Sequence, residues 1–148
     1  MAIVTTSTAK TVQLVYSADP AVTLETKAAT RRKAAQLARV RKAVGDNVAE
    51  LDKAEAAPLD PCFVTLDEAK SAAGATLFRV RALSWLEYQE AEAMAPEAQI
   101  MRHMELGLVD IDGDREAAAK FRADPVASLV VPLYRAIVDL TWGNLPGS

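Results

Sequence analysis

The residues with the clearest potential for chemistry form the run DIDGD, Asp110 to Asp114. An EF-hand calcium loop needs oxygen-bearing side chains at its positions one, three and five, glycine at six and a bidentate glutamate at twelve. Asp110, Asp112 and Asp114 meet the first three requirements. Arg115 and Phe121, however, occupy positions six and twelve. The pattern therefore predicts a solvated polar turn and no calcium site.

No combination of nucleophile, base and metal ligand can be assembled from the remaining residues. His103 is the single histidine and Cys62 the single cysteine, which excludes histidine clusters, an internal disulfide framework and thiol-rich metal sites. Ser84 and Ser128 both lack the Gly-x-Ser-x-Gly setting of a nucleophile elbow. We expect His103 to be a half-buried or surface residue of a helix and Cys62 a small buried hydrophobe. The sequence thus predicts a protein that is not an enzyme, with no catalytic, cofactor-binding or metal-binding residue.

A basic run, Arg31 to Lys33, continues through Arg39, Arg41 and Lys42. These charges surround a predicted helix, and no aromatic residues interleave with them for stacking on bases. The formal net charge of −3 is also small. We interpret the run as a solvated helix surface, with a docking face for an acidic protein as the second reading. A nucleic-acid partner ranks third and is not predicted.

Length and composition indicate a helical, intracellular chain without a membrane span. The 148 residues suit one domain, and the hydrophobic fraction of 51% is largely alanine, with only 5% aromatic residues. Alanine favours helices but buries little area per residue. No apolar run approaches the roughly 20 residues that cross a bilayer, and the start of the chain lacks the pattern of a signal peptide.

The N-terminal part is predicted to contain a strand and a long helix. Val12, Leu14 and Tyr16 alternate with more polar residues, which is typical of a short strand. A helical pattern begins near Thr26, and GDN at residues 45–47 divides it into two helices, with Asp46 or Asn47 capping the second. Steps of three and four residues give this region a narrow apolar seam that suits packing on one partner helix: Leu37, Val40, Val44, Val48 and Leu51.

Prolines at residues 58 and 61 mark a linker, which divides the chain into three segments. Residues 1–57 hold the strand and the basic helix, residues 58–75 the linker and a short helix closed by Gly74, and residues 76–148 a strand and further helices. Whether the segments are separate lobes or one domain is left open. The predicted class is mainly α with a few short strands (α+β), with a compact C-terminal helical bundle.

The stretch FRVRALSWLEYQE, residues 78–90, reads as a strand that turns into a helix. Phe78 and Val80 point to one side of the strand and Arg79 and Arg81 to the other. The following S-x-x-E at residues 84–87 predicts a capping box, in which the serine and glutamate side chains satisfy each other's backbone amides. A cap of this kind is worth about 1 kcal/mol. We therefore interpret this strand-to-helix corner as a structural feature and not as part of an active site.

The last helix is predicted within DPVASLVVPLYRAIVDLTWG, with Asp124 as its cap, Pro132 as a kink or late start, and a strong apolar face. Tyr134 has the spacing of a core residue. Trp142 lies at the end of this helix, where it would cover the helix end or meet another subunit. The residues predicted as an interaction face are Leu37, Val40, Val44, Leu51, Trp85 and Trp142.

The order of parts in the C-terminal two-thirds resembles the tail assembly chaperones of tailed bacteriophages. The resemblance rests on FRVRALSWLEYQE, on an apolar run that ends in an Asp-Gly turn (LVDIDGD), and on the closing helix DPVASLVVPLYRAIVDLTWG. LVYSADPAVTL also looks like the strand and Asp-Pro turn that open such proteins. The resemblance covers about seventy residues more closely, consists of pattern and order, and carries no catalytic signature.

The resemblance implies a non-enzymatic phage morphogenesis protein that binds the tape-measure and tail-tube proteins and leaves the finished particle. Its location would be the host cytoplasm during assembly. The alternative is a structural virion protein, such as a head–tail connector, neck or capsid-associated subunit, which would remain in the virion. An alanine-rich helical body with narrow apolar seams can lie along another extended helix, which fits binding to the tape-measure protein. Self-association also stays open.

Overall fold

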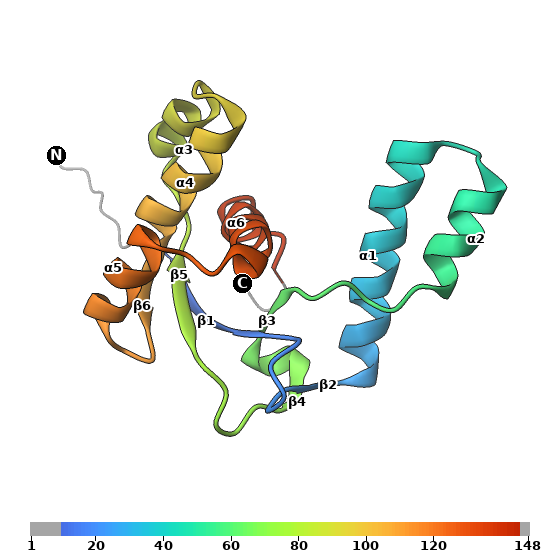
Figure 1. Ribbon diagram of the computed structural model, residues 1–148, viewed down its shortest axis with the longest axis horizontal. Coiled ribbons are helices and arrows are strands. Elements are labelled where there is room, and N and C mark those ends of the chain that lie inside the picture. The colour runs from blue at the N-terminus through green and yellow to red at the C-terminus, as the bar shows by residue number, and fades with distance from the viewer. Residues whose placement is uncertain (1–9, 146–148) are drawn as a thin grey trace, which may run out of the picture.

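The computed structural model describes residues 10–145, and Figure 1 shows its elements. The first part of the chain forms β1 (Thr11–Tyr16), β2 (Thr23–Leu24), α1 (Thr26–Val44), α2 (Val48–Ala56), β3 (Phe63–Thr65), the 3₁₀ turn η1 (Leu66–Glu68) and β4 (Ala69–Ser71). The second part forms β5 (Phe78–Arg81), α3 (Trp85–Glu92), α4 (Pro96–Gly107), β6 (Leu108–Ile111), α5 (Arg115–Ala123) and α6 (Ala127–Thr141).

A four-stranded antiparallel sheet with the order β3-β1-β5-β6 forms the centre of the structure. A second, two-stranded antiparallel sheet pairs β2 with β4. The larger sheet takes strands from all three segments, residues 1–57, 58–75 and 76–148. Residues 1–9, which begin the first segment, and residues 146–148, which end the last, lie outside the described residues.

The expectation of a mainly α protein with a compact C-terminal helical bundle is wrong. The described residues form an α+β structure, with six α-helices and two antiparallel sheets. Helices α4, α5 and α6 pack on β5 and β6 as well as on one another, so the C-terminal part is a helical layer on a sheet. The sheet was underestimated because β3 and β6 span only three and four residues, too few for an alternating pattern to be recognised.

Two local predictions also fail. The run LDEAKSAAG, expected as a short helix, forms η1 and then β4, which pairs with β2. The residues of this run favour a helix when considered alone, but pairing of β4 with β2 imposes an extended conformation on part of it. The last helix begins at Ala127 with Val126 at the cap position, so Asp124 is not its cap. Pro132 lies inside this helix.

One face of the sheet is covered by α4, α5 and α6, and this layer contains the core. Phe78 and Val80 are buried on that face, whereas Arg79 and Arg81 are partly exposed on the other, which confirms the predicted alternation in β5. The following buried residues form one apolar cluster: Leu14, Phe63, Phe78, Val80, Leu83, Met104, Leu108, Ala118, Leu133, Ala136, Ile137, Leu140 and Leu145. Leu133 and Ile137 are both fully buried, as their spacing predicts.

The two helices α1 and α2 form a hairpin that stands beside this body (Figure 1). The predicted division at residues 45–47 is confirmed, since Gly45 ends α1 with a φ of 63° and Asn47 caps α2. The Asn47 side chain accepts a hydrogen bond of 3.2 Å from the Glu50 amide. Strand β2 leads directly into the hairpin, and residues 57–62 lead back to β3.

The close approach of α4 and α6 gives a test of the core. A Cβ atom at Gly107 would lie 2.7 Å from Cγ2 of Ile137, which is fully buried and β-branched. We expect Gly107→Ala to lower the free energy of unfolding by about 1–3 kcal/mol, and Ile137→Ala by about 2–5 kcal/mol. Because Ile137→Ala removes the clashing atoms, the double variant should cost clearly less than the sum of the two. Additive losses in urea unfolding would contradict this packing.

Candidate functional site

The structure brings together Trp85 and Trp142, two residues of the predicted interaction face that are far apart in the sequence. Their ring centroids are 6.1 Å apart in an edge-to-face arrangement. Tyr88 completes the group, with centroid distances of 6.2 Å to Trp85 and 5.3 Å to Trp142. Trp85 is 63% exposed, the adjacent Leu86 64% and Trp142 52%. We call the group of Trp85, Leu86, Tyr88 and Trp142 the aromatic patch.

The patch is positioned by contacts between the start of α3 and the end of α6. The predicted capping box is present, since Ser84 Oγ accepts from the Glu87 amide and Glu87 accepts from the Ser84 amide. The Thr141 hydroxyl accepts a hydrogen bond of 3.0 Å from the Leu83 amide and donates one of 2.8 Å to the Ile137 carbonyl. This bridge holds the residue before the cap of α3 against the last turn of α6, next to Trp142.

An ion pair fixes the angle between β5 and α3. Arg81 donates two hydrogen bonds, of 2.9 and 2.8 Å, to the carboxylate of Glu87. This bidentate bond with Arg81 is the main cause that lowers the pKa of Glu87 to about 2. Glu87 therefore has two roles: it completes the capping box of α3 with Ser84, and it accepts the hydrogen bonds of Arg81 from β5.

His103 lies beneath the patch and is fully buried. The expectation of a half-buried or surface histidine is therefore wrong, because aromatic rings from α3 and α6 cover this position of α4. Its ring packs edge-on against Tyr134 and Tyr88, with centroid distances of 4.9 and 5.9 Å. Nδ1 lies 2.8 Å from the carbonyl of Gln99, which can only accept, so Nδ1 carries the proton. Nε2 is buried and has no hydrogen-bond partner among residues 10–145. The only histidine of the chain thus supports the aromatic patch from below.

The other four residues of the predicted face lie in the α1–α2 hairpin. Leu37, Val40 and Val44 are partly buried in α1, and Leu51 is partly buried in α2. The two helices pack against each other. The structure therefore separates the predicted interaction face into the aromatic patch and the hairpin.

The hairpin is held to the body by a buried ion pair that the sequence analysis missed. Arg32 donates hydrogen bonds of 2.8 and 2.6 Å to the two oxygens of Glu68, a residue that is only 2% exposed. Glu68 also forms a capping box with Thr65, whose amide donates to Glu68 Oε1 at 3.0 Å. Burial opposes the charge of Glu68, but the bonds from Arg32 and Thr65 outweigh it and lower its pKa. The T-x-x-E sequence was the signal that could have predicted this site.

Further contacts between the hairpin and the linker are polar as well. The side chain of Gln36 is buried, accepts a hydrogen bond of 2.7 Å from the Asp60 amide and donates one of 3.4 Å to the Pro58 carbonyl. Within the hairpin itself, Lys33 of α1 donates to the carbonyls of Ala54 and Ala57 at the end of α2. Polar bonds of fixed geometry thus place α1 relative to the body.

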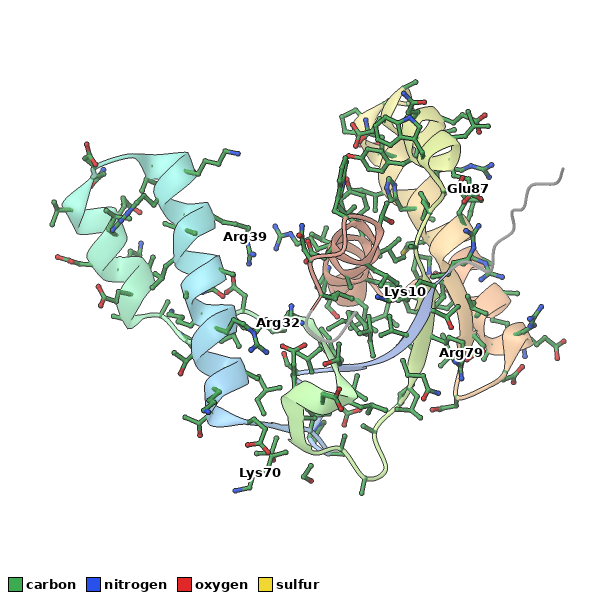
Figure 2. All side chains as sticks on the ribbon, turned by 180° about the vertical axis from the view of Figure 1, so that it is seen from behind. Lys10, Arg32, Arg39, Lys70, Arg79 and Glu87 are labelled. Atoms are coloured by element: carbon green, nitrogen blue, oxygen red, sulfur yellow. The ribbon has the colours of Figure 1, made fainter. Side chains whose placement is uncertain are left out.

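A cleft of about 230 Å³ lies between α1, the linker and α6. Its apolar lining includes the buried Phe63 and Ala136, and arginines from both helices line it: Arg31, Arg32, Arg39 and Arg135. Figure 2 shows Arg32 and Arg39 projecting from α1 towards α6. Within residues 10–145, the guanidinium groups of Arg39 and Arg135 make no hydrogen bond or ion pair. We call this feature the arginine cleft.

The acidic residues of the arginine cleft do not neutralise these two arginines by direct contact. Burial raises the pKa of Asp139 although Arg32, Arg39 and Arg135 act in the opposite direction. Asp60 is exposed in the linker. Cys62, expected to be a small buried hydrophobe, is only partly buried and lines the cleft, and burial raises the pKa of its thiol.

The prediction that DIDGD is a solvated turn is wrong for its first two residues, because Asp110 and Ile111 belong to β6 and Asp110 is buried, accepting a hydrogen bond of 3.2 Å from Arg79. The turn itself is formed by the residues that follow. Asp112 and Gly113 adopt φ values of 54° and 78°, and Asp114 caps α5 by accepting from the Glu116 amide at 2.8 Å. Within residues 10–145, no three His, Cys, Asp or Glu side chains gather as a metal-binding group. In the same part of the chain, no helix combines the length and the apolar character that crossing a membrane requires.

The pKa of Glu87 predicts an acid-sensitive corner. Because the folded-state pKa of about 2 lies below the unfolded value of about 4.3, the Glu87 bonds stabilise the fold above about pH 5, and this contribution is lost as the pH falls towards 2. Glu87→Gln keeps a residue suited to the capping box but removes the ion pair. We expect its stability deficit, measured by urea unfolding, to shrink between about pH 5 and about pH 3.

The matched control is Glu90→Gln in the same helix. Glu90 is exposed, and its carboxylate has no hydrogen bond or ion pair within residues 10–145. This variant should differ little from the natural protein across the same pH range. A deficit of Glu87→Gln that stays constant with pH would contradict the proposed role of the ion pair.

The chain was compared with models of protein families, with curated proteins and with solved structures. No family model, no curated protein and no solved structure matches it.

Proposed function

We propose that the protein is a non-enzymatic morphogenesis protein of a tailed bacteriophage, a tail assembly chaperone that binds the tape-measure and tail-tube proteins. It acts in the host cytoplasm during assembly and leaves before the particle is complete. The proposal is carried by the aromatic patch, because Trp85, Leu86 and Trp142 are each more than half exposed and lie together. Clustered, exposed tryptophans are typical of surfaces that bind other proteins.

The chemistry of the patch suits an apolar segment of a protein partner. Trp85 and Trp142 meet edge to face, so two differently oriented rings are presented on one surface. The rings are held by the capping box and the Thr141 bridge, which limits the conformational entropy lost on binding. An amphipathic helix of the tape-measure protein, with apolar side chains at steps of three and four, would bury its apolar face here.

The resemblance in residues 76–148 supplies the identity of the partner in this proposal. The stretch that opens the resemblance, FRVRALSWLEYQE, contains Trp85, and the closing helix DPVASLVVPLYRAIVDLTWG contains Trp142. The two ends of the resembling region therefore meet in the aromatic patch. The alternative, a structural virion subunit, would use the same patch as a permanent contact with its neighbours.

The test is a pull-down of the tagged full-length chain from phage-producing cells, followed by mass spectrometry. We expect the natural protein to recover the tape-measure protein, and Trp85→Ser/Trp142→Ser to lose it at least tenfold. The control Val48→Ser/Val131→Ser changes two other exposed apolar residues, 67% and 42% exposed, outside the patch. It should recover the partner as the natural protein does.

Purified particles distinguish the two readings. Absence of the protein from finished particles, together with recovery of the tape-measure protein, would agree with the chaperone. A fixed stoichiometry in particles would favour the structural subunit instead. Failure to recover any tail or capsid protein would contradict both.

A further inference from the structure

We propose that the protein associates head to tail with further copies of itself, the α3 end of one copy entering the arginine cleft of the next. The α3 end consists of the exposed Trp85 and Leu86 together with the acidic residues of α3 and the start of α4. This inference concerns the purified chain alone and does not depend on the phage assignment.

The first argument is charge complementarity. Helix α1 carries Lys and Arg side chains but no Asp or Glu, whereas residues 85–101 contain four glutamates and no Lys or Arg. The carboxylates of Glu90 and Glu97 have no hydrogen bond or ion pair within the described residues, and neither do the guanidinium groups of Arg39 and Arg135 in the cleft. The cleft also contains Asp60 and Asp139, but four arginines line it, so positive charge is in excess there. An acidic α3 end of a second copy would complement that charge.

The second argument is the match between an apolar projection and an apolar recess. Leu86 and Glu90 are one helical turn apart, so an exposed apolar side chain and a free carboxylate share one face of α3. The arginine cleft has the reverse arrangement, with Phe63 and Ala136 in its lining and arginines on two helices around them. Its volume of about 230 Å³ is below the range of pockets for drug-sized ligands, about 300–1,000 Å³, and suits individual side chains of a protein.

One chain cannot make this contact with itself. The α3 end and α1 lie on opposite sides of α6, as Figures 1 and 2 both show. The contact must therefore form between copies, and it joins two different surfaces. Such a heterologous contact builds either closed rings or open chains. In an open chain, one terminal copy keeps a free α3 end and the other a free cleft.

The contact also covers part of the aromatic patch in the free protein. Trp85 belongs both to the patch and to the α3 end. A protein that binds the patch would compete with the next copy of the chain. Self-association would then cover the exposed Trp85 until such a partner binds.

The experiment is sedimentation velocity on the purified full-length protein over a range of concentrations at low and high salt. We expect the average mass to rise above the 15.9 kDa of the monomer with concentration and to fall when salt is added. Two variants should each remain near 15.9 kDa: Arg39→Gln/Arg135→Gln, which alters the cleft, and Trp85→Ser/Leu86→Ser, which alters the α3 end. All four side chains are exposed, so both variants should fold.

Mixing the two variants is the decisive step. The cleft variant keeps an intact α3 end and the other variant keeps an intact cleft, so an equimolar mixture should form a 1:1 complex of twice the 15.9 kDa mass and nothing larger. The control Arg41→Gln/Lys42→Gln changes exposed charges of α1 outside the cleft and should associate as the natural protein does.

Three results would overturn the proposal. One is a natural protein that stays at 15.9 kDa at every concentration. Another is association that Arg39→Gln/Arg135→Gln leaves unchanged. The third is a mixture of the two monomeric variants that forms no complex, since this would indicate a contact between identical surfaces.

Discussion

The packing of α6 against the sheet and α4 is the constraint on which the rest of the structure depends. Ile137 fits against Gly107 so closely that no side chain could replace the glycine hydrogen without movement. This contact fixes the rotation of α6 about its own axis. The rotation in turn determines which side chains α6 directs towards the aromatic patch and which towards the arginine cleft. Trp142, at the end of the helix, lies in the aromatic patch, and Arg135, on its outer face, lines the arginine cleft. One apolar contact therefore positions both candidate binding surfaces.

The α1–α2 hairpin is held by a different kind of force. The apolar cluster of the body contains no residue of α1 or α2 within the described chain. The side chains that tie the hairpin to the body include the Arg32–Glu68 pair and Gln36, which bonds with the linker. Such bonds specify geometry more than they add stability, because desolvation of a buried charge offsets much of its attraction. The width of the arginine cleft consequently depends on polar contacts, whereas the aromatic patch is fixed by core packing.

Sequence reasoning predicted what is encoded locally and missed what arises from distant contacts. The capping box at Ser84 and the cap at Asn47 follow from spacing alone and were confirmed. The strand β3, three residues long, becomes a strand only by pairing with β1, so no local pattern marks it. Trp85 and Trp142 were both predicted as interaction residues, but their contact depends on the Thr141 bridge. The arginine cleft could not be predicted, since it exists only between two elements that the sequence places far apart.

The separation of charge within the molecule bears on how the two surfaces would work together. A net charge of −3 is too small to keep copies apart, but a basic α1 on one side and an acidic α3 on the other give the molecule an electrostatic direction. Approach with opposite ends facing is then favoured over approach with like ends facing. A chain of copies built this way always ends in one uncovered α3 end, and a protein that binds the aromatic patch there would prevent the next copy from adding. Partner binding and self-association would thus be linked by mass action. The more tightly a partner binds the aromatic patch, the more it lowers the apparent affinity of one copy of the chain for the next, and the reverse also holds.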